Sequence, residues 1–524
     1  MFAIDRARKV STLVITCIGF FMVLLDASIV TVALPTIQTD LHASLSELQW
    51  VVDAYTLPFA VLLLTAGTLG DRFGRKRLFL VGLGIFTFGS ALCGLAPTFG
   101  WLVAGRVIQG VGGAALSPGS LSVLASAFPE PRERARVIGI WSGVSGIALA
   151  AGPLVGGLLI QISSWSAIFF INVPIGLVAL VLGWLVLKES RNPDAKRVDL
   201  PGQVLIVAGL TSLTYALIEG NSQGWASPFI LTLFAASALF ICAFLIVEAR
   251  VKEPLLPLFL FKNAVFSAAN IAATVVGFAL LGTVFFIAQY FQGIQGYTAL
   301  GSGLRTLPTT MGIFIAAPVA GWLTSRFGPR LPVTAGALLS GTALLLLTSI
   351  EPTTDYMYIW WKFAMLGTGF GLMLSPLTVA VLASTPRARA GLASSMVNTS
   401  RQIGGVLGIA LLGALVANQF SSNILHKLTV AGIPSDLAQK ISTTIAGAGT
   451  LASRVPLPGK LPIAAPVLHT LISISFTDAI HAGFIVSGVA LLGTAVLSAS
   501  LLGGVQREVD QEKIATQDIV PGEV

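Results

Sequence analysis

The sequence predicts an all-α integral membrane protein with fourteen transmembrane helices, and its composition and its hydropathy pattern carry this prediction. Hydrophobic residues make up 55% of the 524 residues and charged residues only 10%, whereas about a quarter of an average soluble domain is charged. The mean hydropathy is +0.87. Apolar windows of about 20 residues, the length that crosses a bilayer, alternate with short basic segments. Because the basic residues gather in these segments, the net charge of +8 does not indicate nucleic-acid binding.

The apolar windows divide into groups of six, two and six. They lie near 11–34, 48–69, 79–97, 101–125, 137–161 and 167–187, then 203–219 and 228–247, then 266–290, 305–324, 332–350, 358–383, 392–418 and 480–503. We expect a six-helix bundle at 1–190, two inserted helices at 191–262 and a second six-helix bundle at 263–505. A polar tail follows at 506–524.

Lysine and arginine favour the cytoplasmic side of a membrane. They precede the first window and recur in alternate connections, as at Arg75–Arg77 and Arg326–Arg330. This asymmetry predicts a multi-pass protein of the cell membrane with both termini in the cytoplasm. One long external loop is then expected at about 421–475. Its residues Leu437, Ile441 and Ile445 are spaced for one helix face, which favours a helical hairpin lying on the outer leaflet.

A charged turn occurs twice, at Gly67–Arg77 and at Gly321–Arg330, in the shared frame G-x-L-x-x-R-F-G-x-[KR]. An internal repeat of this kind is typical of secondary transporters. Asp71 is suited to cap a neighbouring helix or to pair with an arginine, so the turn is a candidate conformational latch. The alternative is a solvated loop that obeys the charge rule. The candidate latch residues are Gly67, Gly70, Asp71, Arg72, Gly74, Arg75 and Lys76.

Three charged residues of the first half, Asp26, Asp53 and Arg106, fall inside predicted spans. A charge within a span is costly unless it is paired or hydrated. A buried carboxylate whose distance from an arginine changes between conformations can load and release a proton, so all three are proton-coupling candidates. The alternative is a fixed ion pair that holds the spans together.

The fifth window contains a small-residue face interrupted by a proline. Small residues allow helices to pack closely, and proline removes a backbone hydrogen bond, so this segment is a candidate hinge or leak-sealing contact. A generic packing helix is the alternative. The residues concerned are Gly146, Gly152, Pro153, Gly156 and Gly157.

The second half offers no acidic residue at 263–350 or at 356–435. Its polar residues inside spans are instead candidates for the lining of a substrate cavity, with Gln109 of the first half added to them. They are Gln289, Tyr290, Asn398, Arg401 and Gln402.

Enzymatic chemistry has no support in the sequence. Neither a phosphate-binding G-x-x-x-x-G-K-[ST] loop nor an H-E-x-x-H zinc motif is present. The three cysteines fall in apolar windows and the four histidines lie in or next to external segments. We therefore expect no enzyme activity, no cofactor and no metal site.

Five segments in order resemble the fourteen-helix drug:proton antiporter branch of the major facilitator superfamily. They are Leu25–Pro35, Gly67–Arg77, Arg106–Gly113, Gly146–Gly157 and Ile171–Gly176. The resemblance implies two six-helix bundles with two additional central helices, alternating access, and proton-driven export with Asp26 and Arg106 in the coupling apparatus. Two departures are Ser325, where the second turn often has an acid, and Ser166-Ala167, where the branch often has Arg-Trp.

These features favour a proton-coupled exporter of drugs or small amphipathic compounds. A dedicated exporter or importer of one metabolite is the alternative within transport, and a non-transporting sensor or scaffold is an alternative from another class. The second half lacks acids and contains Arg401, which favours neutral, zwitterionic or weakly anionic substrates. The expected partners are the substrate, protons and the bilayer, with no obligate protein partner and a monomeric state.

Overall fold

A computed structural model describes residues 2–192, 198–386, 389–449 and 465–503. The tail at 506–524 lies outside these ranges. Within them the chain is helical and contains no strand. The helices are α1 (Phe2–Leu41), α2 (Leu45–Phe73), α3 (Arg75–Gly94), α4 (Phe99–Ala127), α5 (Pro131–Ile162), α6 (Ala167–Phe170), α7 (Asn172–Val186), α8 (Leu200–Gln223), α9 (Pro228–Arg250), α10 (Ala264–Gln289), α11 (Ala299–Phe327), α12 (Arg330–Leu347), α13 (Trp360–Ala383), α14 (Ala390–Val430), α15 (Ser435–Ala448) and α16 (Ala465–Leu501). Two short 3-10 helices, η1 (Leu258–Lys262) and η3 (Tyr356–Tyr358), and a short π-helix, η2 (Tyr290–Ile294), complete the secondary structure of the described residues.

Fourteen helices in the described part of the chain are long and apolar enough to cross a membrane, which confirms the prediction. α6 and α7 together form one of these spans, and α15 is not among them. Local signals explain several helix starts. Ser44 and Glu47 form a reciprocal capping box before α2, with Ser44 Oγ accepting from Glu47 N at 3.2 Å. The side chain of Asn263 accepts from Val265 N at 2.9 Å before α10.

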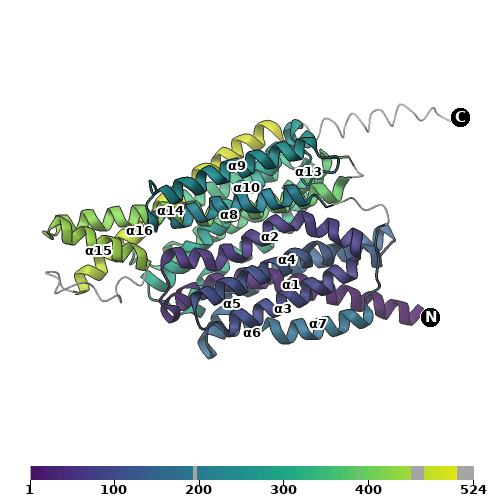
Figure 1. Cartoon of the computed structure of the whole chain (residues 1–524), viewed down its shortest axis with the longest axis horizontal. Helices are drawn as coiled ribbons and strands as arrows, with labels where there is room; N and C mark the ends of the chain where they lie inside the picture. The colour runs from purple at the N-terminus through teal and green to yellow at the C-terminus, as the bar shows by residue number, and fades with distance from the viewer. Residues whose placement is uncertain (1, 193–197, 387–388, 450–464, 504–524) are drawn as a thin grey trace.

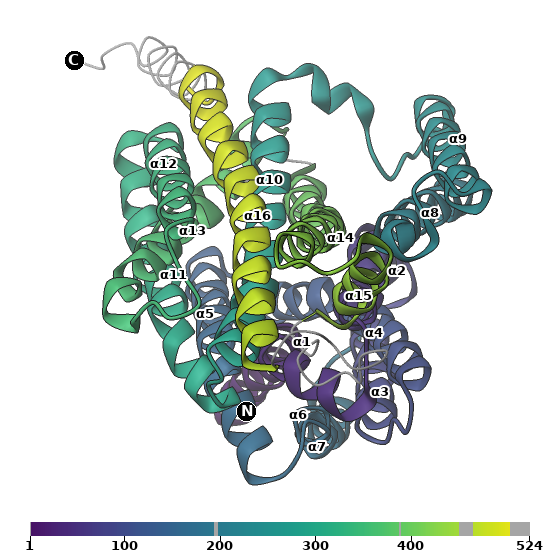
Figure 2. The same ribbon diagram turned by 90° about the vertical axis from the view of Figure 1, so that its left-hand side faces the viewer.

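The spans form two bundles, α1–α7 and α10–α14 with α16 (Figures 1 and 2). α8 and α9 pack against each other, and α8 also contacts α2 of the first bundle and α14 of the second. The inserted helices are thus central in the chain but lie at the edge of the molecule, with α9 outermost (Figure 2). On another side of the bundles, α5 packs against α11.

α1 begins and α16 ends at the same end of the bundles, which we call the terminal end (Figure 1). At the opposite end α14 and α16 extend beyond the other helices, and α15 packs beside α14. The expected external loop at 421–475 is therefore largely helical where it is described. Ile441 and Ile445 of α15 are buried in the protein core, so the apolar face expected to lie on lipid is covered by protein instead.

Contacts between the bundles gather towards the opposite end. Gln49 Nε2 of α2 donates to Ile409 O of α14 at 2.7 Å. Gln292 Nε2 of η2 donates to Val32 O of α1 at 2.9 Å. Towards the terminal end, by contrast, a side chain added at Gly139 or Gly143 of α5, or at Gly321 of α11, would meet no atom within 4 Å. These two hydrogen bonds therefore join the bundles at the opposite end.

Candidate functional site

Close packing of α3 against α4 positions the polar residues of the first bundle. A Cβ atom added at Gly89 of α3 would lie 2.7 Å from Gln109 N of α4, so no side chain larger than hydrogen fits there. Gly112 of α4 approaches the backbone of Phe86 in the same way. Small residues therefore bring Gln109 beside Ser90 of α3.

Asp26 of α1 and Arg106 of α4 form a buried ion pair, with 0% and 1% of their side chains exposed. Arg106 Nη1 donates to Asp26 Oδ2. The other oxygen, Oδ1, accepts from Gln109 Nε2 at 3.0 Å and from Asn172 Nδ2 of α7 at 3.3 Å. Both amides also donate to Ser90 Oγ, at 3.0 and 3.1 Å. The ionised carboxylate thus has three donors, supplied by α4 and α7.

The guanidinium of Arg106 has further partners that compensate its burial. Its Nε donates to Val51 O of α2 at 3.0 Å, and its Nη1 also donates to Gln109 Oε1 at 2.9 Å. Its central carbon lies 4.3 Å from the ring centroid of Tyr55, a cation–π distance. The hydroxyl of Tyr55 donates to Val23 O of α1 at 3.1 Å. Four helices therefore hold this pair.

Protonation of Asp26 would change this cluster chemically. A protonated oxygen becomes a donor, so at least one of the three groups that donate to Asp26 must move or turn. Within the cluster, Asn172 Oδ1 is buried and has no hydrogen-bond partner among the described residues. With its amide rotated, Asn172 could therefore accept a hydrogen bond from the protonated Asp26 through Oδ1. The cluster has hydrogen-bonding partners for both protonation states of Asp26.

Asp53 of α2 does not join this cluster. Its side chain is fully buried, and neither carboxylate oxygen has a partner among the described residues. One turn earlier on α2, Gln49 bonds to α14, so this part of α2 lies at the contact between the bundles. A carboxyl group without partners is costly to ionise. The surroundings of Asp26 therefore favour its charged form, whereas those of Asp53 disfavour it.

The structure separates the six cavity candidates. Gln109 belongs to the Asp26 cluster. Arg401 Nη2 donates to Asn398 Oδ1, so these two residues of α14 meet, and Gln402 beside them is half-buried. Gln289 of α10 is buried with both amide atoms unpartnered among the described residues. Tyr290 is buried at the opposite end, where its hydroxyl donates to Glu351 O at 2.7 Å.

The charged turn between α2 and α3 is held by contacts within the first bundle. Arg75 Nη2 donates to Asp71 Oδ1 at 2.8 Å. Glu189, in the segment after α7, accepts from the backbone N–H groups of Lys76 and Arg77 at 3.1 and 3.2 Å. Asp71 thus pairs within its own turn, and Glu189 is the residue that caps α3.

The remaining residues of this turn also have defined positions. Gly74 has φ of +117°, and a Cβ there would lie 2.6 Å from the carboxyl group of Glu189. Lys76 Nζ donates to Trp184 O at 2.7 Å, and the Arg72 guanidinium lies over the ring of Phe73. A Cβ at Gly70 would lie 2.9 Å from Leu78, and one at Gly67 would meet no atom within 4 Å.

The glycines of α5 face two partners. Side chains at Gly152 and Gly156 would collide with Ser28 and Ile29 of α1. On another face, a Cβ at Gly157 would lie 2.5 Å from Leu300 Cα of α11. The carbonyl of Pro153 lies against Gly303 of α11, and Gly146 lies against the ring of Phe314. This segment therefore joins α5 both to its own bundle and to the second bundle.

Sequence reasoning did not select several residues that the structure places in these sites. Asn172 lies in the segment Ile171–Gly176 that carries part of the resemblance but was not selected as a site residue, although a polar side chain within an apolar window could have identified it. Ser90 and Tyr55 had no distinguishing signal, because such residues are common in membrane helices. Glu189 lies 113 positions after Lys76 in the sequence, so only folding brings them together. No group of three or more metal-ligating side chains occurs in the described ranges.

The chain is similar to known export and resistance proteins. It is 38% identical to the tetracenomycin C resistance and export protein of Streptomyces glaucescens, over 94% of this chain and 91% of that protein. It is 38% identical to the multidrug resistance protein Stp of Mycobacterium tuberculosis, over 79% and 77%. It is 37% identical to a methylenomycin A resistance protein of Streptomyces coelicolor, over 76% and 84%.

Among solved structures, the fold matches a bacterial homolog of the human lysosomal transporter Spinster in an inward-facing, unoccupied conformation. The TM-score is 0.64 at 19% identity, over 95% of this chain and 98% of that one. The profile of the major facilitator superfamily matches residues 16–409. By this match and by the similarity of its relatives, the chain belongs to the major facilitator superfamily.

Proposed function

We propose that this protein is a proton-coupled exporter of drugs or small amphipathic compounds that works by alternating access in the cell membrane. The terminal end faces the cytoplasm in this proposal, in accord with the positive charges in the connections at that end. The protein acts as a monomer, without an obligate protein partner and without enzymatic activity. Its relatives, which include export, multidrug resistance and antibiotic resistance proteins, support the choice of substrate class.

The observation that carries the proposal is the buried pair of Asp26 and Arg106. The pair lies where four helices of the first bundle meet, with Gln109 and Asn172 completing the coordination of Asp26. Binding a proton to Asp26 competes with the ion pair, so any movement of α1 against α4 changes proton affinity. A change of conformation is then linked to proton uptake or release.

Asp53 is the second proton carrier in this proposal. It is buried without a partner beside the contact of α2 with α14, which must change when the bundles rock. A proton on Asp53 lowers the cost of its burial by removing the charge, and in this proposal its release requires the contact to open to water. The same motion would thus act on two different groups. Asp26 is held in its charged form by Arg106, whereas burial without partners favours the neutral form of Asp53.

The contacts between bundles support the alternating-access part. The bundles meet at the opposite end, through α2 with α14 and α5 with α11, and in this proposal they are apart at the terminal end. With the terminal end in the cytoplasm this is an inward-facing state. The glycines at 152–157 allow the close approach that closes the other side, and the charged turn at 67–76 is the latch that exchanges partners when the terminal end closes.

Substrate charge follows from the second bundle. Arg401 is neutralised by no acid there, and its described partner is the amide oxygen of Asn398. Gln289 presents both of its amide atoms without a partner. A cavity lined on the side of the second bundle by a guanidinium or by neutral amides, and by no acid, would favour neutral, zwitterionic or weakly anionic amphipathic molecules over lipophilic cations.

The test is efflux of a fluorescent amphipathic dye from intact cells, with and without a proton uncoupler. Wild type is compared with Asp26→Asn and with Asp40→Asn, which removes an exposed carboxyl group of the same helix. We expect uncoupler-sensitive efflux that Asp26→Asn abolishes and Asp40→Asn preserves, at equal amounts of folded protein. Transport that persists with the uncoupler would contradict proton coupling. Absence of transport for every dye would favour a dedicated metabolite carrier.

A further inference from the structure

A second pair of acidic side chains lies far from Asp26, at the base of the inserted helices. Asp199 precedes α8 and Glu248 is in the last turn of α9, and both are buried, with 5% and 3% of their surface exposed. Their carboxyl groups lie beside each other, next to Gly202 of α8. A Cβ added at Gly202 would lie 2.6 Å from Asp199 Oδ2 and 2.8 Å from Glu248 Oε1, so both oxygens point to one place.

The other two carboxyl oxygens have backbone partners. Asp199 Oδ1 accepts from Gly202 N at 2.9 Å and caps α8. Glu248 Oε2 accepts from Leu256 N at 3.0 Å, in the segment that leads to α10. Asp199 Oδ2 and Glu248 Oε1 have no donor among the described residues. Because an ionised carboxylate only accepts hydrogen bonds, two of them in contact and out of water require a shared proton or a cation.

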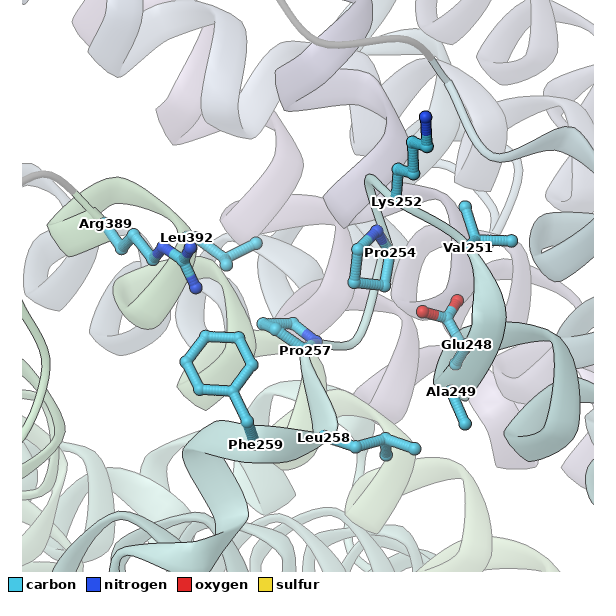
Figure 3. Close-up of a pocket in the computed structure, with 10 residues that line it drawn as sticks. All are labelled: Glu248, Ala249, Val251, Lys252, Pro254, Pro257, Leu258, Phe259, Arg389 and Leu392. Carbon is cyan, nitrogen blue, oxygen red and sulfur yellow. The ribbon is translucent and has the colours of Figure 1, made fainter.

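Among the described residues, no lysine or arginine donates a hydrogen bond to Asp199 Oδ2 or Glu248 Oε1. Glu248 lines a pocket whose other side holds Arg389 stacked near Phe259, with Lys252 further along the connecting segment (Figure 3). On the side of α2, Thr65 and Gln203 bond to each other and are neutral. Lys196 and Arg197 precede Asp199 and lie outside the described residues.

We propose that Asp199 and Glu248 share one proton and form a proton-binding site, separate from the transport cluster, that ties α8 and α9 to the segment entering the second bundle. One carboxyl group keeps its O–H and donates it to the carboxylate of the other. When this proton leaves for water, two negative charges remain in contact and repel, and the tie between Asp199, Glu248 and Leu256 weakens. The inserted helices thereby respond to pH at the terminal end.

The sign of the pH effect follows from proton linkage. A folded state that holds a proton which the unfolded chain has released binds more protons, so its stability falls as pH rises. The effect is expected between about pH 6 and about pH 9, the range in which buried carboxyl groups titrate. An amide in place of one carboxyl group donates the same hydrogen bond at every pH, so it should remove the dependence.

The experiment measures the melting temperature of the purified full-length protein across this pH range. Wild type is compared with Glu248→Gln, with Asp199→Asn, which keeps a capping side chain, and with Asp40→Asn as the control. We expect the melting temperature of wild type and of the control to fall with rising pH, and the curves of the two amide variants to be flatter. An unchanged slope in Glu248→Gln would overturn the proposal.

An infrared measurement identifies the proton directly. In an Asp26→Asn, Asp53→Asn background, which removes the carboxyl groups of the transport site, we expect the carbonyl band of a protonated carboxyl group at about pH 7. Glu248→Gln should remove this band, and persistence of the band would contradict the proposal. If Glu248→Gln instead lowers the melting temperature at every pH, both groups are ionised around a cation, which also overturns it.

Discussion

α1 and α4 of the first bundle bury Asp26 against Arg106, whereas in the second bundle the guanidinium of Arg401 of α14 donates to a neutral partner, the amide oxygen of Asn398. The second bundle has no acidic residue at 263–350 or 356–435. Both bundles nevertheless pack their helices through glycines, as at Gly89 on Gln109 and at Gly277 on Arg401 O. Helix packing in the second bundle thus does without a buried ion pair. The buried charges of the first bundle therefore serve another purpose, which in our proposal is proton coupling.

Removing each arginine tests this difference most strongly. Arg106→Gln leaves Asp26 buried without its counter-charge and should cost about 3–5 kcal/mol of stability. Arg401→Gln leaves no acid behind and should cost about 1 kcal/mol, the loss of one hydrogen bond. Thermal unfolding of the purified variants measures both. Equal losses would show that the two arginines have the same structural role.

A double variant sharpens the same comparison. Asp26→Asn combined with Arg106→Gln removes both charges and should recover most of the stability that Arg106→Gln loses, because the penalty comes from the uncompensated charge. Coupled efflux should remain absent in this double variant. A double variant as unstable as Arg106→Gln would mean that the loss comes from packing and not from charge.

Two glycines of α5 test the contact between the bundles, because one lies against α11 and the other has open space beside it. Gly157→Leu places a side chain against Leu300 Cα of the second bundle and should cost about 1–3 kcal/mol through overpacking. Gly143→Leu, on the same helix where no atom lies within 4 Å, should change the unfolding temperature little. Thermal unfolding and dye efflux are the measurements. Similar instability of both variants would contradict a junction confined to the opposite end.

The two charged turns give a smaller contrast. Glu189→Gln removes the negative charge at the start of α3 and should cost about 0.5 kcal/mol, an effect that added salt reduces. In the second turn Ser325 is exposed and, among the described residues, donates to Trp322 O within its own helix, so Ser325→Ala should have no measurable effect. Unfolding temperatures at low and high salt decide the point. A salt-independent loss in Glu189→Gln would exclude the electrostatic explanation.

We expect the last substitution, Arg401→Ala, to change which substrates are exported more than it changes stability. Arg401→Ala should alter the relative efflux of neutral, anionic and cationic dyes more than it alters sensitivity to the uncoupler. Arg326→Ala, an exposed arginine at the terminal end, is the matched control. An unchanged dye profile in Arg401→Ala would remove this residue from the proposed substrate cavity.

The extent of successful prediction differed along the chain. The window expected at 392–418 is within α14, which continues to Val430, and the window expected at 480–503 is the second part of α16, which begins at Ala465. Polar residues such as His469, Thr470 and Asp478 lower the local hydropathy there, so the extension of α16 past the other helices escaped the pattern. Lys427 pairs with Asp478 across this extension at 2.8 Å.

The candidate site was predicted in part for a related reason. Asp26 and Arg106 stand out because ionisable residues are rare in apolar windows, and the structure brings them together. Asp53 stands out equally but lies apart, since a one-dimensional pattern gives the depth of a residue and not the neighbour it faces. Asn172 and Glu189 bind partners supplied by distant segments, and their own sequence surroundings carry no record of those partners.

The sequence by itself determined the membrane class, the fourteen spans and the two-part organisation, because hydropathy and charge act locally and add along each segment. Only the tertiary structure decided that α8 and α9 lie at the edge, that α15 packs on protein, and that Asp199 meets Glu248. These are contacts between residues far apart in the chain. They depend on how whole helix faces fit together, and that fit is a property of the packed molecule.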